Sequence, residues 1–168
     1  MAPLLYWSLT ALLVVVLILL GLWAFQTANR LNRLHVRYDL SWQALDAALA
    51  RRAVVARAIA ADAYRATPQG TRLRTLADAA ERAPRYAREG CENELSTDLT
   101  LLDADVVPLA LMDELAEAES RVLLARRFHN DAVRDTLALR EQRPVRWLKL
   151  GGHAPLPTYF EIAETAQR

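Results

Sequence analysis

The sequence predicts an all-α protein, in which an apolar N-terminal helix continues into an antiparallel bundle of three or four helices, followed by an irregular C-terminal segment. Three observations predict this class. Residues 1–29 carry no charge, whereas all 41 Asp, Glu, Lys and Arg side chains lie in residues 30–168. Residues 22–67 contain neither Gly nor Pro and are rich in the helix formers Ala, Leu and Arg. Strand-like alternation of useful length and internal repeats are both missing from the sequence.

Residues 4–25 have the composition of a membrane span. This uncharged segment of 22 residues is about 33 Å long as a helix, enough to cross a hydrocarbon core of about 30 Å. Aromatic side chains lie near both ends, where a span meets the membrane interfaces: Tyr6, Trp7, Trp23 and Phe25. A cleavable signal peptide and a buried core helix are the alternatives. The signal peptide is disfavoured because no basic residue precedes the apolar core and no clear cleavage site follows it.

The charges that flank the span predict its orientation. No Lys or Arg precedes it, whereas Arg30, Arg33 and Arg37 follow closely. The positive-inside rule then places residues 1–3 outside and the body of the chain in the cytoplasm. The three arginines are also suited to the anionic inner leaflet of the lipid bilayer. A single Cys91 cannot form an intramolecular disulfide, which fits a reducing compartment.

The body begins with a long helix. Apolar residues recur at steps of three and four and form one stripe: Leu31, Leu34, Tyr38, Trp42, Leu45, Leu49, Val55 and Ile59. We expect the span to continue through this helix to about Ala66, where the segment 68–70 (Pro-Gln-Gly) stops it.

A second helical region is expected to start near Thr71, a favourable N-cap residue. Pro84 should kink or break it, and Gly90 is a further weak point. Helicity resumes through Leu102. Residues 103–108 then form a turn, in which Asp105 is a candidate N-cap for the next helix.

A third body helix is expected over residues 109–142. Its core stripe consists of Leu111, Leu115, Ala118, Val122, Ala125, Ala132 and Leu139. Residues 144–158 are rich in Gly and Pro and are expected to be irregular, with a short amphipathic helix over residues 158–166. The bundle thus covers residues 26–143 and the C-terminal segment residues 144–168.

Charge is sorted along the chain. Residues 30–89 have a net charge of +6, residues 90–120 carry nine acidic and no basic side chains, and residues 121–149 have a net charge of +5. We expect the acidic stretch to pack between two basic helices, and a charged surface for a partner is the alternative. Nucleic acid is excluded as a partner because the basic residues are balanced by acidic ones.

Residues suited to chemistry are sparse. The three histidines (His35, His129 and His153) share no metal-ligand spacing, and Cys91 stands alone. His129 lies beside the core stripe and is expected to be a packing residue. Gly151-Gly152 lacks the pattern of a phosphate-binding loop. The sequence therefore predicts no catalytic, cofactor-binding or metal-binding residues and no enzyme activity.

Several motifs occur in a characteristic order. Asn32-Arg33-Leu34 is followed by the run 41–52 (SWQALDAALARR), and the run 117–122 (EAESRV) is followed by 125–133 (ARRFHNDAV) and by Tyr159-Phe160. Together these motifs and the preceding span resemble the LemA family of small bacterial membrane proteins. Most of the chain is covered, although residues 68–105 match only in character.

The departures from that family's pattern indicate a divergent member. Val54, Arg57 and Ala58 replace an acidic residue, a Pro and an Asn, and His129 replaces a Tyr. Ser120 stands for an Asn, and Thr136-Leu137 for a Tyr-Asn pair. One Lys against 20 Arg and 30 Ala indicates a GC-rich genome such as that of an actinobacterium.

The resemblance implies a LemA-like bundle in a bacterial cell membrane, and it implies no catalytic residue, because the family has no settled activity. Its motif residues here are Asn32, Trp42, Leu45, Asp46, Arg51, Glu119, Arg121, Ala125, Arg126, Asn130, Tyr159 and Phe160. We interpret them as structural. Trp42 and Leu45 would face Val122 and Ala125 in the core. Asp46 would pair with Arg51 or with Arg121 and Arg126, and Asn32 and Asn130 would lie where helices meet.

These observations favour a non-catalytic interaction or scaffold module at the cytoplasmic face, with membrane or cytoplasmic protein partners that the sequence does not identify. A homo-oligomer is one option. The first alternative is a sensor or regulator that signals through the continuous first helix. The second is a hydrolase with an unrecognised site near residues 144–158, using His153.

Overall fold

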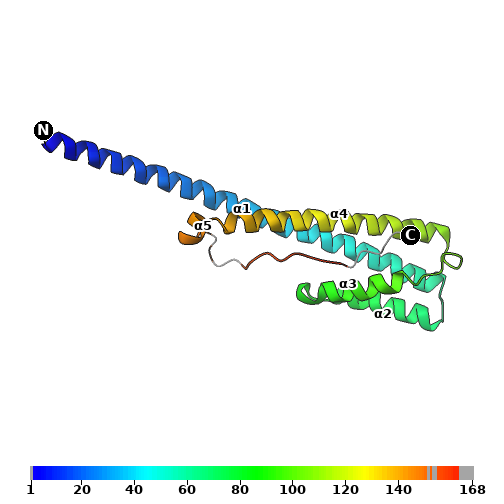
Figure 1. The fold of residues 1–168 in the computed structure, drawn as a ribbon. Helices are drawn as coiled ribbons and strands as arrows, with labels where there is room; N and C mark the ends of the chain where they lie inside the picture. Colours follow the sequence, from blue (N-terminus) through cyan, green and yellow to red (C-terminus); the bar gives the residue numbers. More distant parts are fainter. Residues whose placement is uncertain (1, 151, 153–154, 163–168) are drawn as a thin grey trace. The chain divides into compact units, whose positions relative to one another are not determined.

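The computed structural model describes residues 2–150, 152 and 155–162, and within these ranges it is entirely helical apart from turns and loops (Figure 1). Strands are absent from the described residues, which confirms the predicted all-α class. The five helices are α1 (Ala2–Asp62), α2 (Pro68–Arg82), α3 (Arg85–Leu99), α4 (Leu109–Arg140) and α5 (Arg143–Trp147).

The chain divides into two compact units, and both α1 and α4 contribute to each of them. The N-terminal unit comprises Met1–Tyr38 and Ala132–Pro157. The bundle unit comprises Asp39–Asp131 and Thr158–Arg168. Each unit is described separately below.

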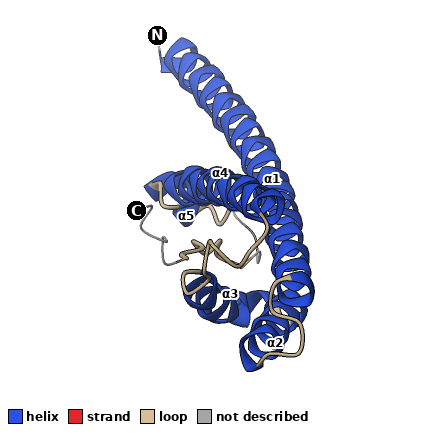
Figure 2. Ribbon diagram, turned by 90° about the vertical axis from the view of Figure 1, so that its right-hand side faces the viewer, coloured by secondary structure: helices blue, strands red, loops and turns tan. Residues whose placement is uncertain are grey.

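In the bundle unit, α1 and α4 run antiparallel. Arg51 of α1 contacts Glu114 near the start of α4, whereas Ser41, ten residues earlier in α1, contacts His129 much further along α4. Helices α2 and α3 are also antiparallel neighbours. Arg72 near the start of α2 pairs with Asp98 near the end of α3, and the two helices lie side by side (Figure 2).

Helix α3 runs in the same direction as α1. Asp46 of α1 pairs with Arg88 of α3. Further along both helices, Arg52 of α1 pairs with Glu92 of α3. The four helices therefore alternate in direction, which confirms the predicted antiparallel bundle.

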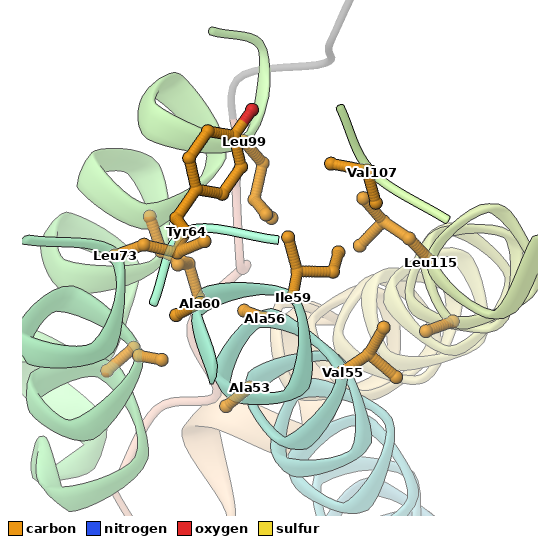
Figure 3. Close-up of a cluster of buried hydrophobic side chains, with 14 residues drawn as sticks. Ala53, Val55, Ala56, Ile59, Ala60, Tyr64, Leu73, Leu99, Val107 and Leu115 are labelled. Carbon is orange, nitrogen blue, oxygen red and sulfur yellow. The ribbon is translucent and has the colours of Figure 1, made fainter. Parts of the chain in front are cut away.

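The main core of the bundle unit draws buried side chains from all four helices (Figure 3). Small residues dominate on α1, where Ala53, Ala56 and Ala60 are almost completely buried and let the neighbouring backbones approach. Larger residues close the core: Ile59, Tyr64, Leu73, Leu95, Leu99, Val107 and Leu115. Each fully buried aliphatic side chain of this size contributes about 1.5–3 kcal/mol to folding.

The predicted core stripes are confirmed. On α1, Leu31, Leu45, Leu49, Val55 and Ile59 are buried, and Leu34, Tyr38 and Trp42 are half-buried. On α4, Leu115, Ala118, Val122, Ala132 and Leu139 are buried, and Leu111 and Ala125 are half-buried.

The connection between α1 and α2 differs from the prediction, in which the segment 68–70 stops the first helix near Ala66 and the next helix starts at Thr71. Instead α1 ends at Asp62, and the segment itself forms the first turn of α2, which begins at Pro68. Proline is tolerated there because the first backbone N–H groups of a helix have no partner within the helix.

Two residues fix this corner. The Thr67 hydroxyl accepts a hydrogen bond from the Gly70 N–H at 3.0 Å and so caps α2. Gly70 is buried against the end of α1, where a Cβ atom would overlap the Tyr64 carbonyl oxygen and lie 3.0 Å from that of Ala60. The close approach of α2 to α1 therefore requires glycine.

Pro84 and Gly90, the two predicted breaks in the second helical region, have different effects. Pro84 separates α2 from α3, as predicted. Gly90 lies within α3 without breaking it, and α3 ends at Leu99 rather than at Leu102.

The predicted turn over residues 103–108 is present, but Asp105 does not cap α4. Its N–H donates to the Asp103 carboxylate at 3.0 Å, within the turn. The Pro108 carbonyl accepts hydrogen bonds from Leu111 and Met112 at the start of α4. At its other end, α4 stops at Arg140, two residues before the predicted end.

The C-terminal segment also differs. It contains the short helix α5 where the sequence predicts an irregular chain. Residues 158–162 of the predicted terminal helix are extended, because their backbone groups bond to side chains of α4 instead of to one another. The rest of that predicted helix, 163–166, lies outside the described residues.

The N-terminal half of α1 is long and apolar enough to cross a membrane, and it is the one such helix among the described residues. The side chains of residues 6–22 are exposed. Thr10 satisfies its hydroxyl within the helix by donating to the carbonyls of Tyr6 and Trp7. Length and composition also suit a signal sequence.

The Gly70 corner gives a stability prediction. We expect Gly70→Ala to lower the free energy of unfolding by about 1–3 kcal/mol, because the added Cβ meets rigid backbone. Thermal unfolding of the full chain in detergent, followed by circular dichroism, measures the change.

Gly90→Ala is the matched control. Gly90 is an exposed helical glycine, and no atom lies within 4 Å of the position that an added Cβ would take. Alanine should therefore raise stability there by about 0.5–1 kcal/mol. Equal effects of the two substitutions would contradict the close-approach argument.

Candidate functional site

The tail segment, residues 158–162, lies across α4 in the bundle unit. Asn130 holds it with both ends of its side-chain amide. Its Nδ2 donates to the Phe160 carbonyl at 3.1 Å, and its Oδ1 accepts from the Phe160 N–H at 2.9 Å. Arg126, one helical turn earlier, donates to the Ile162 carbonyl at 3.3 Å. The side chains of α4 thus satisfy the tail backbone as a neighbouring strand would.

Phe160 anchors the tail in a second apolar cluster. It is 3% exposed and packs with Leu45 and Leu49 of α1 and Val122 of α4. The Trp42 ring meets it edge to face, with 5.7 Å between centroids. Tyr159, its neighbour, is 48% exposed.

His129 joins the tail to α1. Its ring is 1% exposed, its Nδ1 lies 3.1 Å from the Ser41 hydroxyl, and its Nε2 lies 3.3 Å from the Thr158 carbonyl. A carbonyl only accepts, so Nε2 carries a proton, and in the neutral ring the Ser41 hydroxyl then donates to Nδ1. Both ring nitrogens are thus engaged by the chain itself, which agrees with the packing role predicted for His129.

The surroundings of His129 also disfavour its charged form. Burial lowers its pKa below 6.5, the Thr158 carbonyl opposes this, and the positive charge of Arg85 adds to the lowering. Arg85 lies over the Trp42 ring at 4.1 Å in a cation–π contact. Trp42 in turn meets the His129 ring edge to face at 5.6 Å.

A buried ionic cluster links α3 to α1. Glu92 is completely buried and lies 2.7 Å from Arg52 of α1 and 2.9 Å from Arg88 of its own helix. Arg88 also pairs with Asp46 at 3.2 Å, and Arg52 donates to the Ser96 hydroxyl at 3.0 Å. Two arginines and two carboxylates therefore balance in charge, and Glu92 has a cationic partner on each oxygen.

Glu119 of α4 lies beside this cluster. Its partial burial raises its pKa, and the charge of Arg52 partly offsets that rise. The Arg52 Nε is buried without a hydrogen-bond partner among the described residues. Both carboxylate oxygens of Glu92 are occupied by arginines of the chain itself, which supports a structural role for the cluster.

Six of the predicted motif residues meet at the tail, and a seventh, Tyr159, belongs to it. Trp42, Leu45, Ala125 and Phe160 meet in the second apolar cluster, and Asn130 bonds to the Phe160 backbone. Val122 completes this cluster, so Trp42 and Leu45 face α4 as predicted. Arg126 binds the tail backbone, and Glu119 lies near Arg52.

The remaining motif residues do not make the predicted contacts. Asp46 pairs with Arg88, not with Arg51, Arg121 or Arg126, because α3 packs beside α1 and brings its own arginine to this carboxylate. Asn32 is exposed on α1 rather than placed where helices meet. Arg51 pairs with Glu114 and Arg121 with Glu117, both on the surface.

The sequence interpretation missed the Arg52–Glu92–Arg88 cluster. A signal for it was present in the spacing. Arg52 falls three residues after Leu49 on the core stripe of α1, and Glu92 falls three residues before Leu95 in α3. Charged residues at core positions of two helices indicate a buried ion pair, because a lone buried charge is costly.

The predicted packing of the acidic stretch between basic helices is partly confirmed. Glu92 and Glu114 pair with arginines of α1, and Asp98 pairs with Arg72 of α2 at 2.8 Å. The second basic stretch, residues 121–149, contributes Arg121, which pairs with Glu117 of the same helix, α4.

Groups of His, Cys, Asp or Glu that could hold a metal ion do not occur in the described part of the chain. His153, on which the hydrolase alternative depends, lies outside the described residues. Comparison of the chain with protein-family models, curated proteins and solved structures gives no match. The LemA resemblance therefore stays a prediction from the motif residues.

The ionic cluster predicts a large difference between two carboxylates. We expect Glu92→Gln to lower the free energy of unfolding by about 3–5 kcal/mol, because it leaves two buried arginines without their shared counter-charge. Glu114→Gln removes an exposed partner of Arg51 and should cost at most about 1 kcal/mol. Denaturation of both full-length variants in detergent measures the difference, and similar values would refute a structural role for the cluster.

His129 predicts a pH dependence. Its pKa is lowered in the folded chain, so its contribution to stability is present above pH 6.5 and is lost as the pH falls below that value. We expect the wild-type free energy of unfolding to decrease on acidification by up to about 1.4 kcal/mol per pH unit more than that of His129→Gln. The glutamine amide can still donate to Thr158 and does not titrate. Parallel curves for the two proteins would exclude His129 as the source.

Proposed function

We propose that this chain is a membrane-anchored, LemA-like helical protein whose bundle is a non-catalytic interaction or scaffold module at the cytoplasmic face of a bacterial cell membrane. One observation carries the proposal. The exposed apolar stretch and the core stripe of the bundle unit belong to the same uninterrupted helix, α1.

Anchoring is supported by exposure. The most apolar 18-residue window of α1 is 0% buried, and its Leu, Val and Ile side chains are roughly half exposed. A stretch of this size exposes far more apolar surface than soluble monomers tolerate. A hydrocarbon environment removes the cost, because every backbone group of a helix is already hydrogen-bonded within it.

The proposed orientation is supported by the first charges after the span. Arg30, Arg33 and Arg37 are exposed, and they lie within about three and a half turns of Phe25. The positive-inside rule then assigns the body to the cytoplasm, with the N-terminus outside.

A non-catalytic role is supported by how the polar groups of the bundle unit are used. His129, Asn130 and Glu92 are engaged by the chain's own tail or helices. On the outward face of α4, in contrast, Leu124 and Phe128 are both 55% exposed and lie one turn apart. That pair offers an apolar contact for a protein partner.

Anchoring has a direct test. We expect the full chain to stay in the membrane pellet after carbonate extraction, and Leu13→Arg/Leu17→Arg to release it, since each central arginine costs about 2.5–3.5 kcal/mol of insertion. Leu124→Arg is the control, because Leu124 is equally exposed but lies on the bundle. Release of the wild-type chain would contradict an anchor, and digestion of the body by protease in intact spheroplasts would contradict the orientation.

The interaction role is tested by crosslinking in membranes. We expect partner proteins to be captured by the wild-type chain and lost from Phe128→Glu. Recovery of the chain alone, or an identical set with both proteins, would count against this use of α4.

A further inference from the structure

Helix α5 and the turn that follows it form an exposed amphipathic surface in the N-terminal unit. We name residues 143–150 the α5 corner. Trp147 is 89% exposed and Leu148 is 50% exposed. Three basic side chains of the same eight residues are also exposed: Arg143, Arg146 and Lys149. None of the three basic groups takes part in an ion pair with another described residue.

The corner is fixed next to the end of the apolar stretch. Val145 of α5 is 1% exposed and packs with Leu31 of α1 and Leu139 of α4. Leu31 follows Phe25 by six residues, which is about 9 Å along the helix axis. The polar headgroup layer extends about 5–8 Å beyond the hydrocarbon core on each side. If α1 spans a membrane, the packing of Val145 therefore places the corner at the headgroup surface.

The backbone presents the exposed side chains in a defined turn. Lys149 has a φ of 50°, in the left-handed region, and closes the turn after α5. The Leu150 N–H donates to the Val145 carbonyl at 3.1 Å, and the Lys149 N–H donates to the Arg146 carbonyl at 3.2 Å. Leu150 is half-buried against the same cluster as Val145. Trp147 and Leu148 are thus held outside the packed cluster.

The charge of the whole unit selects an anionic partner. The residues of the N-terminal unit include eight basic and two acidic side chains, whereas the rest of the chain has 13 basic and 18 acidic ones. One of the two acidic groups, Asp135, pairs with Arg37 at 3.2 Å. An exposed Trp–Leu pair flanked in the chain by basic residues matches the interfacial zone of an anionic bilayer, where indole rings and basic side chains are both favoured.

We propose that the α5 corner binds the anionic phospholipid surface beside the span, with Trp147 and Leu148 inserted at the interface and Arg143, Arg146 and Lys149 on the headgroup phosphates. This inference rests on the proposed membrane anchor. It adds a second, peripheral membrane contact to the same unit.

Site-specific fluorescence in proteoliposomes tests the proposal. The full chain carries Cys91→Ser and Leu148→Cys, the latter labelled with an environment-sensitive fluorophore. It is reconstituted in phosphatidylcholine vesicles with or without phosphatidylglycerol. We expect a blue-shifted emission and protection from acrylamide only when phosphatidylglycerol is present. Both leaflets have the same composition, so random insertion does not affect the result.

Val36→Cys is the matched control position. Val36 is 52% exposed on α1 in the same unit, and it lies eleven residues beyond Phe25, about 16 Å along the axis. Its label should stay accessible to acrylamide in both kinds of vesicle, because it lies beyond the headgroup layer.

Charge variants provide the second readout. Arg143→Gln, Arg146→Gln and Lys149→Asn should each reduce the ratio of bound to free corner about five-fold, and added salt should reduce it further. Asparagine is chosen at position 149 because it tolerates the left-handed backbone. Trp147→Ala should abolish the blue shift even where the charges are intact.

Three outcomes would overturn the proposal. The first is an accessible Leu148→Cys label in phosphatidylglycerol vesicles. The second is equal protection in both lipids that the charge variants do not change. The third is protection that depends on protein density, which would indicate a second copy of the chain.

Carbonate extraction of the same vesicles separates the two proposals. Loss of the chain contradicts the anchor, whereas retention of the chain with an accessible label contradicts only the lipid contact of the corner.

Discussion

Helix α1 is one continuous hydrogen-bonded helix whose side chains are exposed in its first part and packed along one face in its second part. Over residues 6–22 its side chains are exposed on all sides and, apart from Ser8 and Thr10, lack polar side-chain character, whereas from Leu31 onward one stripe is buried. The change coincides with the first charges of the chain, at Arg30 and Arg33. The backbone hydrogen bonds of a helix are made within the helix, whether its surroundings are apolar or aqueous. No break is therefore needed where the composition changes. The rest of the fold follows from the stripe, since α4 and the α5 corner contact α1 along it and α2 is positioned at its end by Gly70.

Helix α3 depends on this stripe in a different way. Its inward face contains Arg88, Glu92 and Ser96 in addition to Leu95 and Leu99. Apolar burial alone would leave the register of such a helix poorly defined. The contacts of Arg52 with Glu92 and Ser96 admit one register, because a shift by one turn would leave a buried charge without its partner. In this bundle the ionic cluster therefore specifies position, while the alanine- and leucine-rich core supplies most of the free energy.

The sequence predicts what depends on periodicity and misses what depends on distant partners. The stripes of α1 and α4 follow from spacing alone, and the break at Pro84 follows from local sterics. The predicted start of α2 is wrong because Pro68 and Gly70 disfavour a helix interior, yet both suit a first turn capped by Thr67. The tail is predicted as a helix because its local pattern is amphipathic. Its extended form depends on Asn130, 30 residues earlier in the chain, and no local signal reports that contact.

The charges of the two compact units differ in sign, which the order of charges along the chain does not show. The alternation of basic, acidic and basic stretches predicts helix pairing, and the pairs of Glu92, Asp98 and Glu114 account for part of it. Pairing leaves an excess of charge that is positive for the N-terminal unit and negative for the remainder of the chain. An anionic bilayer attracts the first and repels the second over about one Debye length, roughly 8–10 Å. With the proposed anchor in such a bilayer, electrostatics would favour lipid contact by the N-terminal unit, whereas the exposed Leu124 and Phe128 belong to the part of the chain with excess negative charge.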